Sequence, residues 1–128
     1  MATVGKSLSA RILEQASART GARTWMLERT TSVALVPLVL WFIVSAMSLS
    51  GAGYEEVRAW LAAPFNTVAM LLTIITVFWH AQLGAHVIVD DYVHGEATKL
   101  ATLIAVNFAT VAVGLACVVA VLRVAFGS

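Results

Sequence analysis

Residues 59–92 read AWLAAPFNTVAMLLTIITVFWHAQLGAHVIVDDY, and this stretch decides the fold. It carries no Asp, Glu, Lys or Arg from Ala59 to Val89. A helix needs about 20 apolar residues to cross about 30 Å of hydrocarbon, and this run exceeds that length. The run therefore predicts a membrane-spanning helix, with His80 deep inside it and a polar Asp-Asp-Tyr cluster at its end.

Two further charge-free runs, Thr30–Tyr54 and Leu100–Leu122, are also long enough to cross a membrane. They explain why 60% of the residues are hydrophobic and only 12% are charged, since a soluble domain of 128 residues needs more charge to cover its surface. The runs are continuous rather than alternating, which disfavours a transmembrane β-barrel. The sequence predicts an all-α integral membrane protein with three transmembrane helices.

The expected boundaries divide the chain into a polar N-terminal arm, residues 1–29, and one three-span membrane domain, residues 30–128. Pro64 and Asn66 indicate the start of the second span, with Asn66 as its cap. Helices are expected at about residues 31–49, 66–92 and 97–122.

Lysine and arginine set the expected orientation. Six of the eight positive residues lie in the arm or in the turn that ends at Lys99, and only Arg58 and Arg123 lie on the other side. Positive residues favour the cytoplasmic or matrix side. The sequence therefore predicts a bacterial inner (cytoplasmic) membrane, with the N-terminus in the cytoplasm and the C-terminus in the periplasm. The mitochondrial inner membrane is the alternative, because the Arg- and Ser-rich arm is also compatible with a transit peptide.

The composition also argues against two function classes. A net charge of +1, without a basic patch that includes aromatic residues, does not indicate binding to nucleic acid. Cys117 is the single cysteine, so neither an internal disulfide nor a cysteine metal site is expected. It is expected to pack as a small apolar residue.

One face of the second span combines unusual residues. Wound as a helix at about 100° per residue, the span places His80, Gly84, Val87 and Asp91 within about 60° of one another. Asp91 lies about 16 Å from His80 along the axis, which is too far for both to bind one metal ion. The separation suits a large cofactor inside the membrane and a second, polar site at the membrane surface.

An ionisable residue inside a span is costly and is by default a functional candidate. Two interpretations of His80 stay open: a neutral histidine hydrogen-bonded to a neighbouring helix, or an axial ligand to haem. His86 lies about 240° round the helix from His80, and His94 about 21 Å along it. Neither reaches across a porphyrin ring, so a second haem ligand would have to come from another polypeptide.

Asp90, Asp91 and Tyr92 are expected at the membrane surface. The helix dipole opposes a carboxylate at a C-terminus by about 0.3–1 kcal/mol, so two in sequence indicate either a solvated loop or a site that handles protons. The Tyr92 phenol is either an ordinary interfacial tyrosine or a donor to a carbonyl oxygen. A quinone suits a phenol and an acid at this depth. Asp90 with His94 at i,i+4 is a weaker alternative, a metal chelate with only two ligands.

With these residues, the chain resembles the smaller, D-type (cytochrome b-type) membrane-anchor subunit of succinate dehydrogenase. This enzyme is the succinate:quinone oxidoreductase also called complex II. The matching features are three spans in a chain of this length, Arg29-Thr30-Thr31-Ser32 at the start of the first helix, and above all His80-Ala81-x-x-Gly84 followed by Asp91-Tyr92-Val93. Only the motif from His80 to Val93 is specific.

The resemblance implies a role for each matching residue. His80 would be the axial ligand that this subunit gives to a haem b shared with a second anchor subunit. Tyr92 would donate a hydrogen bond to a ubiquinone carbonyl, and Asp91 would be its acidic neighbour. Arg29 would lie near a haem propionate, although a snorkelling anchor also explains an arginine there. Asp90 stands where the family pattern commonly has an uncharged residue, so either carboxylate is a candidate for the functional acid.

The resemblance also implies partners. Succinate would be oxidised in a flavoprotein subunit, and electrons would pass through an iron–sulfur subunit to ubiquinone, which links the tricarboxylic acid cycle to electron transport. This chain would be a hydrophobic anchor in a larger heteromeric helix bundle. It has no flavin-binding fingerprint and no cysteine cluster, so it would have no dehydrogenase activity alone. The sequence does not exclude fumarate reduction. The rival interpretation is a structural or transport-related three-helix subunit without haem, in which His80 is a packed polar residue.

Overall fold

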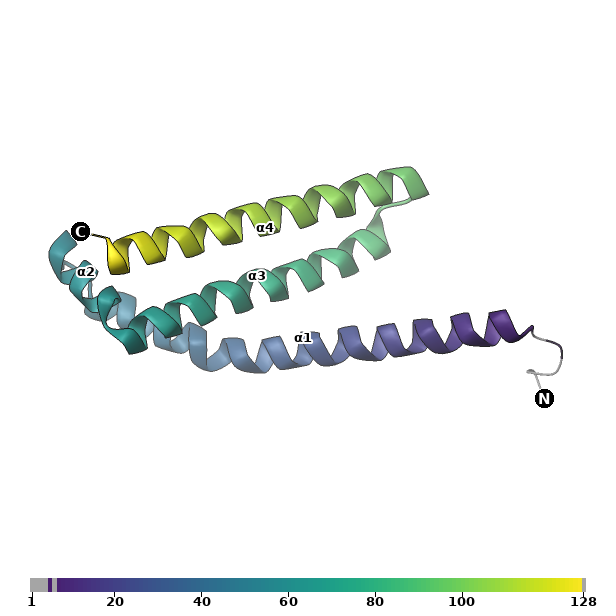
Figure 1. The fold of residues 1–128 in the computed structure, drawn as a ribbon, viewed down its shortest axis with the longest axis horizontal. Coiled ribbons are helices and arrows are strands. Elements are labelled where there is room, and N and C mark those ends of the chain that lie inside the picture. The colour runs from purple at the N-terminus through teal and green to yellow at the C-terminus, as the bar shows by residue number, and fades with distance from the viewer. Residues whose placement is uncertain (1–4, 6, 128) are drawn as a thin grey trace.

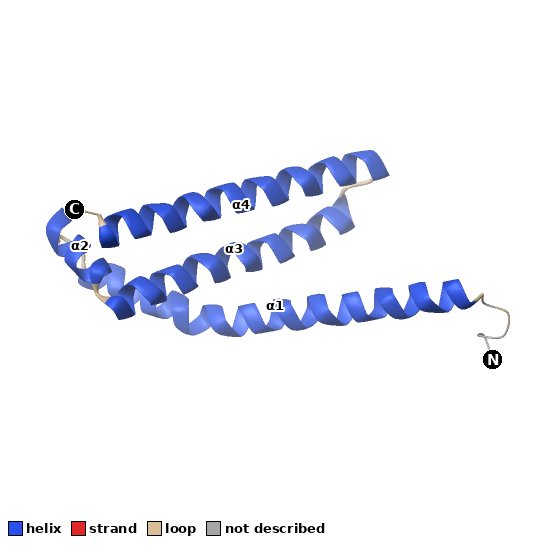
Figure 2. Ribbon diagram, viewed as in Figure 1, coloured by secondary structure: helices blue, strands red, loops and turns tan. Residues whose placement is uncertain are grey.

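A computed structural model describes residue 5 and residues 7–127, and in that part of the chain every regular element is a helix (Figure 2). The elements are α1 (Leu8–Ser48), α2 (Tyr54–Ala62), α3 (Pro64–Tyr92) and α4 (Glu96–Phe126). Among the described residues, α1, α3 and α4 are the 3 helices long and apolar enough to cross a membrane. The prediction of an all-α protein with three membrane spans is confirmed.

The middle element of the fold is α3. It contacts α1 and α4, whereas α1 and α4 do not contact each other within the described helices. Figure 1 shows α3 and α4 as an antiparallel pair, and α1 diverging from α3 toward the N-terminal end of α1. The three spans thus form an open row rather than a closed bundle. Such a row leaves apolar helix surface for lipid or for other membrane subunits.

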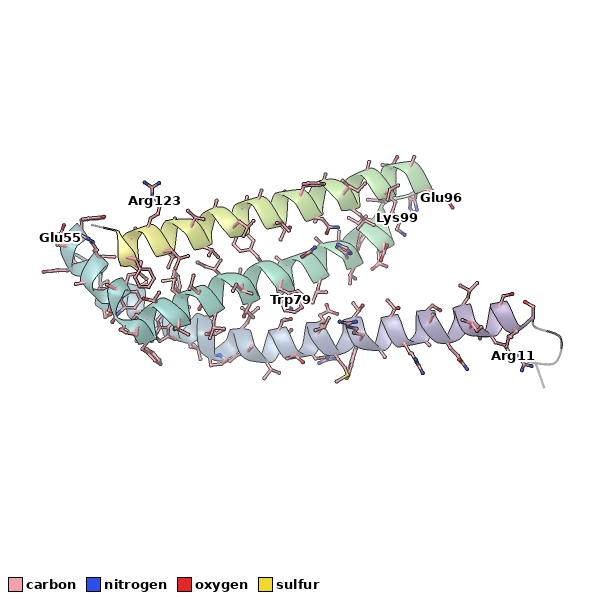
Figure 3. The ribbon with its side chains drawn as sticks, viewed as in Figure 1. Arg11, Glu55, Trp79, Glu96, Lys99 and Arg123 are labelled. Atoms are coloured by element: carbon pink, nitrogen blue, oxygen red, sulfur yellow. The ribbon has the colours of Figure 1, made fainter. Side chains whose placement is uncertain are left out.

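The first helix is much longer than expected. It begins at Leu8 instead of residue 31, so most of the expected polar arm is helical. Ser7 caps it by accepting a hydrogen bond from the Ala10 N–H at 3.3 Å. The arm is rich in Ala, Arg, Leu and Glu, which favour a helix even where they face water. At 41 residues, α1 is about 60 Å long, about twice the hydrocarbon thickness. Its N-terminal part, which carries Arg11, extends past the ends of the other spans (Figure 3).

The start of α3 also differs from the expectation. Its first residue is Pro64, where the missing N–H costs little, and Ala63 occupies the cap position without a side-chain hydrogen bond. Asn66 is therefore not the cap, and that prediction was wrong. Its Nδ2 instead donates to the Trp60 carbonyl at 2.9 Å. This hydrogen bond fixes α3 to the preceding short helix.

That short helix, α2, was not expected, and it joins the elements at the end of the molecule opposite the N-terminus. Trp60 stacks on Trp41 of α1, with ring centroids 5.7 Å apart. Arg58 donates a hydrogen bond to the Gly127 carbonyl. Through these contacts α2 holds α1, α3 and the end of α4 together at one end.

The other end holds the turn between α3 and α4. Gly95 has φ +92°, a conformation that favours glycine, and it lets the chain reverse after Tyr92. The fourth helix starts at Glu96 and continues past the expected residue 122 to Phe126. Lys99 and Glu96 lie at the same end of the molecule as Arg11, whereas Glu55 and Arg123 lie at the opposite end (Figure 3). The arm and this turn therefore lie at the same end of the molecule, as expected.

Candidate functional site

His80 lies in the interior of α3, about 18 Å from the Tyr92 end. Its side chain is half-buried. Its Nδ1 lies 3.0 Å from the Oγ1 of Thr31 on α1. The histidine is therefore hydrogen-bonded to a neighbouring helix, and this contact joins α1 to α3 near the middle of the span.

The Thr31 hydroxyl indicates which nitrogen of His80 carries the proton. Its Oγ1 lies 2.8 Å from the Leu27 carbonyl oxygen and 3.0 Å from the Glu28 carbonyl oxygen. The hydroxyl is placed to donate to these backbone oxygens, and it has a single proton to donate. When that proton is directed at the backbone, Thr31 accepts a hydrogen bond from His80, and this arrangement favours the tautomer with the proton on Nδ1. In the neutral imidazole, Nε2 carries the lone pair.

The second ring nitrogen of His80 is accessible. Within the described residues Nε2 makes no hydrogen bond, and no buried side-chain nitrogen or oxygen lacks a partner. Nε2 is therefore at the surface of this chain. Gly84 follows one turn later on the same face, and a Cβ built there would meet no atom within 4 Å. A free imidazole nitrogen beside open space fits a large planar cofactor bound through one axial nitrogen, as in haem proteins.

His86 belongs to a different cluster, between α3 and α4. The Asn107 Oδ1 accepts a hydrogen bond from Gln82 Nε2 at 2.7 Å. The same oxygen lies 2.8 Å from His86 Nε2, which donates because an amide oxygen is only an acceptor. All three side chains are half-buried. Hydrogen bonds between polar side chains hold membrane helices together, so this cluster is a helix-packing contact and leaves His80 as the candidate ligand.

Replacing Asn107 by leucine is expected to weaken the packing of α3 against α4. The substitution leaves Gln82 and His86 without their common acceptor, at a cost of about 1–2 kcal/mol. Unfolding of the purified complex, followed by circular dichroism during a denaturant titration, measures this loss. Thr110→Val is the matched control, because within the described residues the Thr110 hydroxyl bonds only to the Val106 carbonyl of its own helix. Equal stability of the two variants would contradict a packing role for Asn107.

Asp90, Asp91 and Tyr92 are the last three residues of α3, and they differ in their hydrogen-bond and ion-pair partners. Asp90 Oδ1 pairs with Lys99 Nζ at 3.0 Å, which links α3 to α4 across the turn. Asp91 and Tyr92 are exposed, Tyr92 at 77%, and their side chains make no hydrogen bond or ion pair within residues 7–127. The described residues hold no group of three His, Cys, Asp or Glu side chains that could bind a metal ion. Asp90 is thus engaged in a structural contact, and Asp91 is free beside Tyr92.

Arg29 is exposed, and its guanidinium lies 5.4 Å from the centroid of the Trp25 ring. Arg29 and Thr31 are two positions apart in α1, which corresponds to a rotation of about 200° around the helix axis. Arg29 therefore points away from the α1 face on which Thr31 meets His80. The structure therefore does not bring Arg29 to the His80 region, and its expected role rests on the resemblance alone.

Two residues of the site were not singled out from the sequence. Thr31 lies in the hydroxyl-rich segment that opens the first span, but the sequence does not show which of Thr30, Thr31 and Ser32 faces α3. Asn107 was recognisable, because an amide inside an apolar run needs a polar partner.

The comparisons with known proteins agree on one family. The family model described as succinate dehydrogenase/fumarate reductase transmembrane subunit matches residues 7–120. The succinate dehydrogenase hydrophobic membrane anchor subunit of Rickettsia conorii is 30% identical over 105 residues, covering 81% of this chain and 83% of that protein. That of Rickettsia bellii is 30% identical over 105 residues, with 82% and 84% covered. The succinate dehydrogenase membrane anchor subunit of Reclinomonas americana is 26% identical over 99 residues, with 75% and 82% covered. No solved structure gives a significant match.

Proposed function

The chain belongs to the succinate dehydrogenase/fumarate reductase transmembrane subunit family, and we propose that it holds one side of a haem b and forms part of a ubiquinone-reduction site. As a membrane anchor subunit of succinate dehydrogenase, it acts within a larger enzyme and not alone. The finer proposal assigns the haem to His80 and the quinone to Tyr92 and Asp91.

The accessible Nε2 of His80 is the observation that supports the haem proposal. Thr31 engages Nδ1, so the nitrogen with the lone pair is the one that faces outward from this chain. A haem bound there would supply a one-electron carrier inside the membrane. His80 would hold the iron through Nε2, and Gly84 would leave space for the group, because even a Cβ there would meet no atom within 4 Å. The resemblance alone assigns a propionate to Arg29.

The other axial ligand would come from a second anchor subunit of the cytochrome b type. His86 donates to Asn107 in the α3–α4 contact, so it is not free to bind iron. His94 lies beyond the end of α3, about 21 Å along the chain axis from His80. The open row of spans leaves apolar surface on which a second membrane subunit can pack. A flavoprotein and an iron–sulfur subunit complete the proposed assembly.

Tyr92 and Asp91 support the quinone proposal because both are exposed at the end of α3 and make no hydrogen bond or ion pair within the described residues. Oxidation of succinate to fumarate releases two electrons and two protons, and reduction of a quinone to a quinol consumes two of each. In this proposal, the Tyr92 hydroxyl donates a hydrogen bond to a quinone carbonyl oxygen, where negative charge develops during reduction. The Asp91 carboxyl exchanges a proton with water and passes it toward the same oxygen.

The haem proposal is tested by the reduced-minus-oxidised absorption spectrum of the complex purified with its membrane partners. An α-band that depends on the His80 imidazole supports the proposal. A complex that assembles and reduces quinone without any such band would favour an anchor without haem, in which His80 only packs against Thr31.

Substituting the two neighbouring carboxylates should separate their roles. Asp91→Asn is expected to lower the rate of quinone reduction several-fold, because the amide cannot transfer a proton; water can partly replace it at so exposed a position. Asp90→Asn should leave that rate unchanged and remove only the contact with Lys99. That pair is partly exposed, at 59% and 37%, and its loss costs less than about 1 kcal/mol. Steady-state succinate:quinone activity measures both variants. A rate loss in Asp90→Asn alone would reverse the assignment.

We further propose that the end of the molecule with Tyr92 faces the cytoplasm of a bacterial inner membrane. The positive residues Arg11, Arg19 and Lys99 lie at this end, together with the N-terminal part of α1. Positive charge near the ends of short spans favours the cytoplasmic side. The C-terminus would then lie in the periplasm.

A further inference from the structure

We propose that Thr31 is a positioning residue for the haem ligand. Its hydroxyl accepts the Nδ1 proton of His80, fixes the tautomer and orientation of the ring, and so makes Nε2 the nitrogen that binds iron. This inference rests on the proposed haem function, and nothing in the resemblance or the comparisons assigns this role to Thr31.

The first support is the direction of the hydrogen bonds. The Thr31 hydroxyl hydrogen is shared between the carbonyl oxygens of Leu27 and Glu28, at 2.8 and 3.0 Å. Only the lone pairs of Oγ1 then face His80 Nδ1, 3.0 Å away. An imidazole with its proton on Nε2 would instead have to take the hydroxyl proton away from the two backbone acceptors. The arrangement therefore favours the tautomer that can ligate iron through Nε2.

The second support is the rigidity of the hydroxyl. Thr31 is only 7% exposed, and it is the one buried residue of α1. Its β-branched side chain has few rotamers in a helix, and its hydrogen bond to the helix backbone restricts them further. The acceptor is thus held in place before any ligand binds. Residues that hydrogen-bond to the second nitrogen of a metal-bound histidine orient the ring and tune its basicity.

The chemical nature of the partner has a consequence for the haem. A hydroxyl oxygen is an uncharged acceptor, so the Nδ1 proton stays on the ring. A carboxylate would accept a stronger hydrogen bond from Nδ1 and make Nε2 more basic. Removing the acceptor altogether makes Nε2 less basic still. A less basic ligand stabilises ferric iron less, so loss of the Thr31 hydroxyl should raise the haem midpoint potential.

The test compares Thr31→Val with wild type in the assembled complex. Valine keeps the shape of threonine and removes the acceptor. Haem affinity is expected to fall about 10- to 100-fold, read as the ratio of haem to flavin after washing. The highest g-value of the oxidised low-spin haem should shift, because the ring is free to rotate, and the midpoint potential should rise. Thr31→Ser, which restores the hydroxyl, should return all three values toward wild type.

Thr73→Val is the matched control. Thr73 is also 7% exposed and also donates to its own helix, to the Ala69 carbonyl at 2.7 Å, but within the described residues it makes no hydrogen bond with His80. It should leave the g-value and the potential unchanged. If Thr31→Val gives the same haem content, g-value and potential as Thr73→Val, the positioning role is wrong. If Thr31→Val does not assemble, Thr31→Cys provides the comparison, since a thiol is a poor acceptor of similar size.

These outcomes are distinct from a failure of the haem function itself. If His80→Ala keeps its full haem spectrum, the proposed function fails and the Thr31 inference fails with it. If His80→Ala loses the haem but Thr31→Val does not differ from Thr73→Val, only the Thr31 inference is overturned.

Discussion

Replacing His80 by alanine is expected to remove the haem b absorption of the assembled complex. Alanine has no nitrogen to bind iron, and His86, the other histidine of α3, is held by Asn107 on another face of that helix. Because changes to residues that only support a ligand reduce metal affinity by about 10- to 100-fold, loss of the ligand itself should exceed that range. The reduced-minus-oxidised difference spectrum measures the result directly, normalised to the flavin of the same preparation.

The informative control is His86→Ala, which removes an imidazole of equal size about one and two-thirds turns away on the same helix. Its spectrum should match that of wild type, although its stability should fall because Asn107 loses a donor. Two results would contradict the assignment. An unchanged α-band in His80→Ala shows that the iron, if present, is held elsewhere, and a band lost only in His86→Ala moves the ligand to the α3–α4 contact.

The spans could be predicted from the sequence because a membrane imposes a single strong condition, about 20 residues without charge. The predicted start of the first helix, in the polar segment outside the span, was wrong. Nothing in that condition stops a helix at Arg29, and the polar segment before it consists largely of helix-favouring residues, so α1 continues back to Leu8. Asn66 misled for a similar reason: an asparagine after a proline suits a cap, but Pro64 can itself be the first residue of a helix.

The position of His80 was also predictable, since a histidine in a charge-free run stands out. Its partner was not, because the contact with Thr31 depends on how α1 is rotated against α3, and three consecutive hydroxyl residues offer three rotations. The ambiguity between Asp90 and Asp91 had the same origin. The reversal at Gly95 brings Lys99 back to within 3.0 Å of Asp90, a contact that depends on the shape of the turn. This contact distinguishes the two carboxylates: Asp90 is paired with Lys99, and Asp91 makes no such pair within the described residues.

Tyr92→Phe is expected to slow quinone reduction by the assembled complex roughly 10- to 100-fold. Phenylalanine keeps the ring and removes the hydroxyl, and a hydrogen bond to a group that becomes charged contributes about 1.5–3 kcal/mol, which corresponds to that range. Succinate oxidation with an artificial acceptor, which takes electrons before they reach the membrane, should stay at the wild-type rate. The two assays on one preparation therefore separate damage at the quinone site from damage to the assembly.

The chain supplies its own control, because Tyr54 is its second tyrosine, is 67% exposed and lies on α2 at the opposite end of the molecule. If both tyrosines only occupy the membrane interface, Tyr92→Phe and Tyr54→Phe should behave alike, with normal rates in both assays. A quinone site requires them to differ, with the loss confined to Tyr92 and to the quinone assay. Tyr92 is 77% exposed, so a partner subunit must cover it when quinone binds, since a hydrogen bond to a developing charge is strongest where water is excluded. If Tyr92→Phe reduces quinone at the wild-type rate, the Tyr92 hydroxyl is not the hydrogen-bond donor. There is then no reason to expect the quinone pocket at this end of α3.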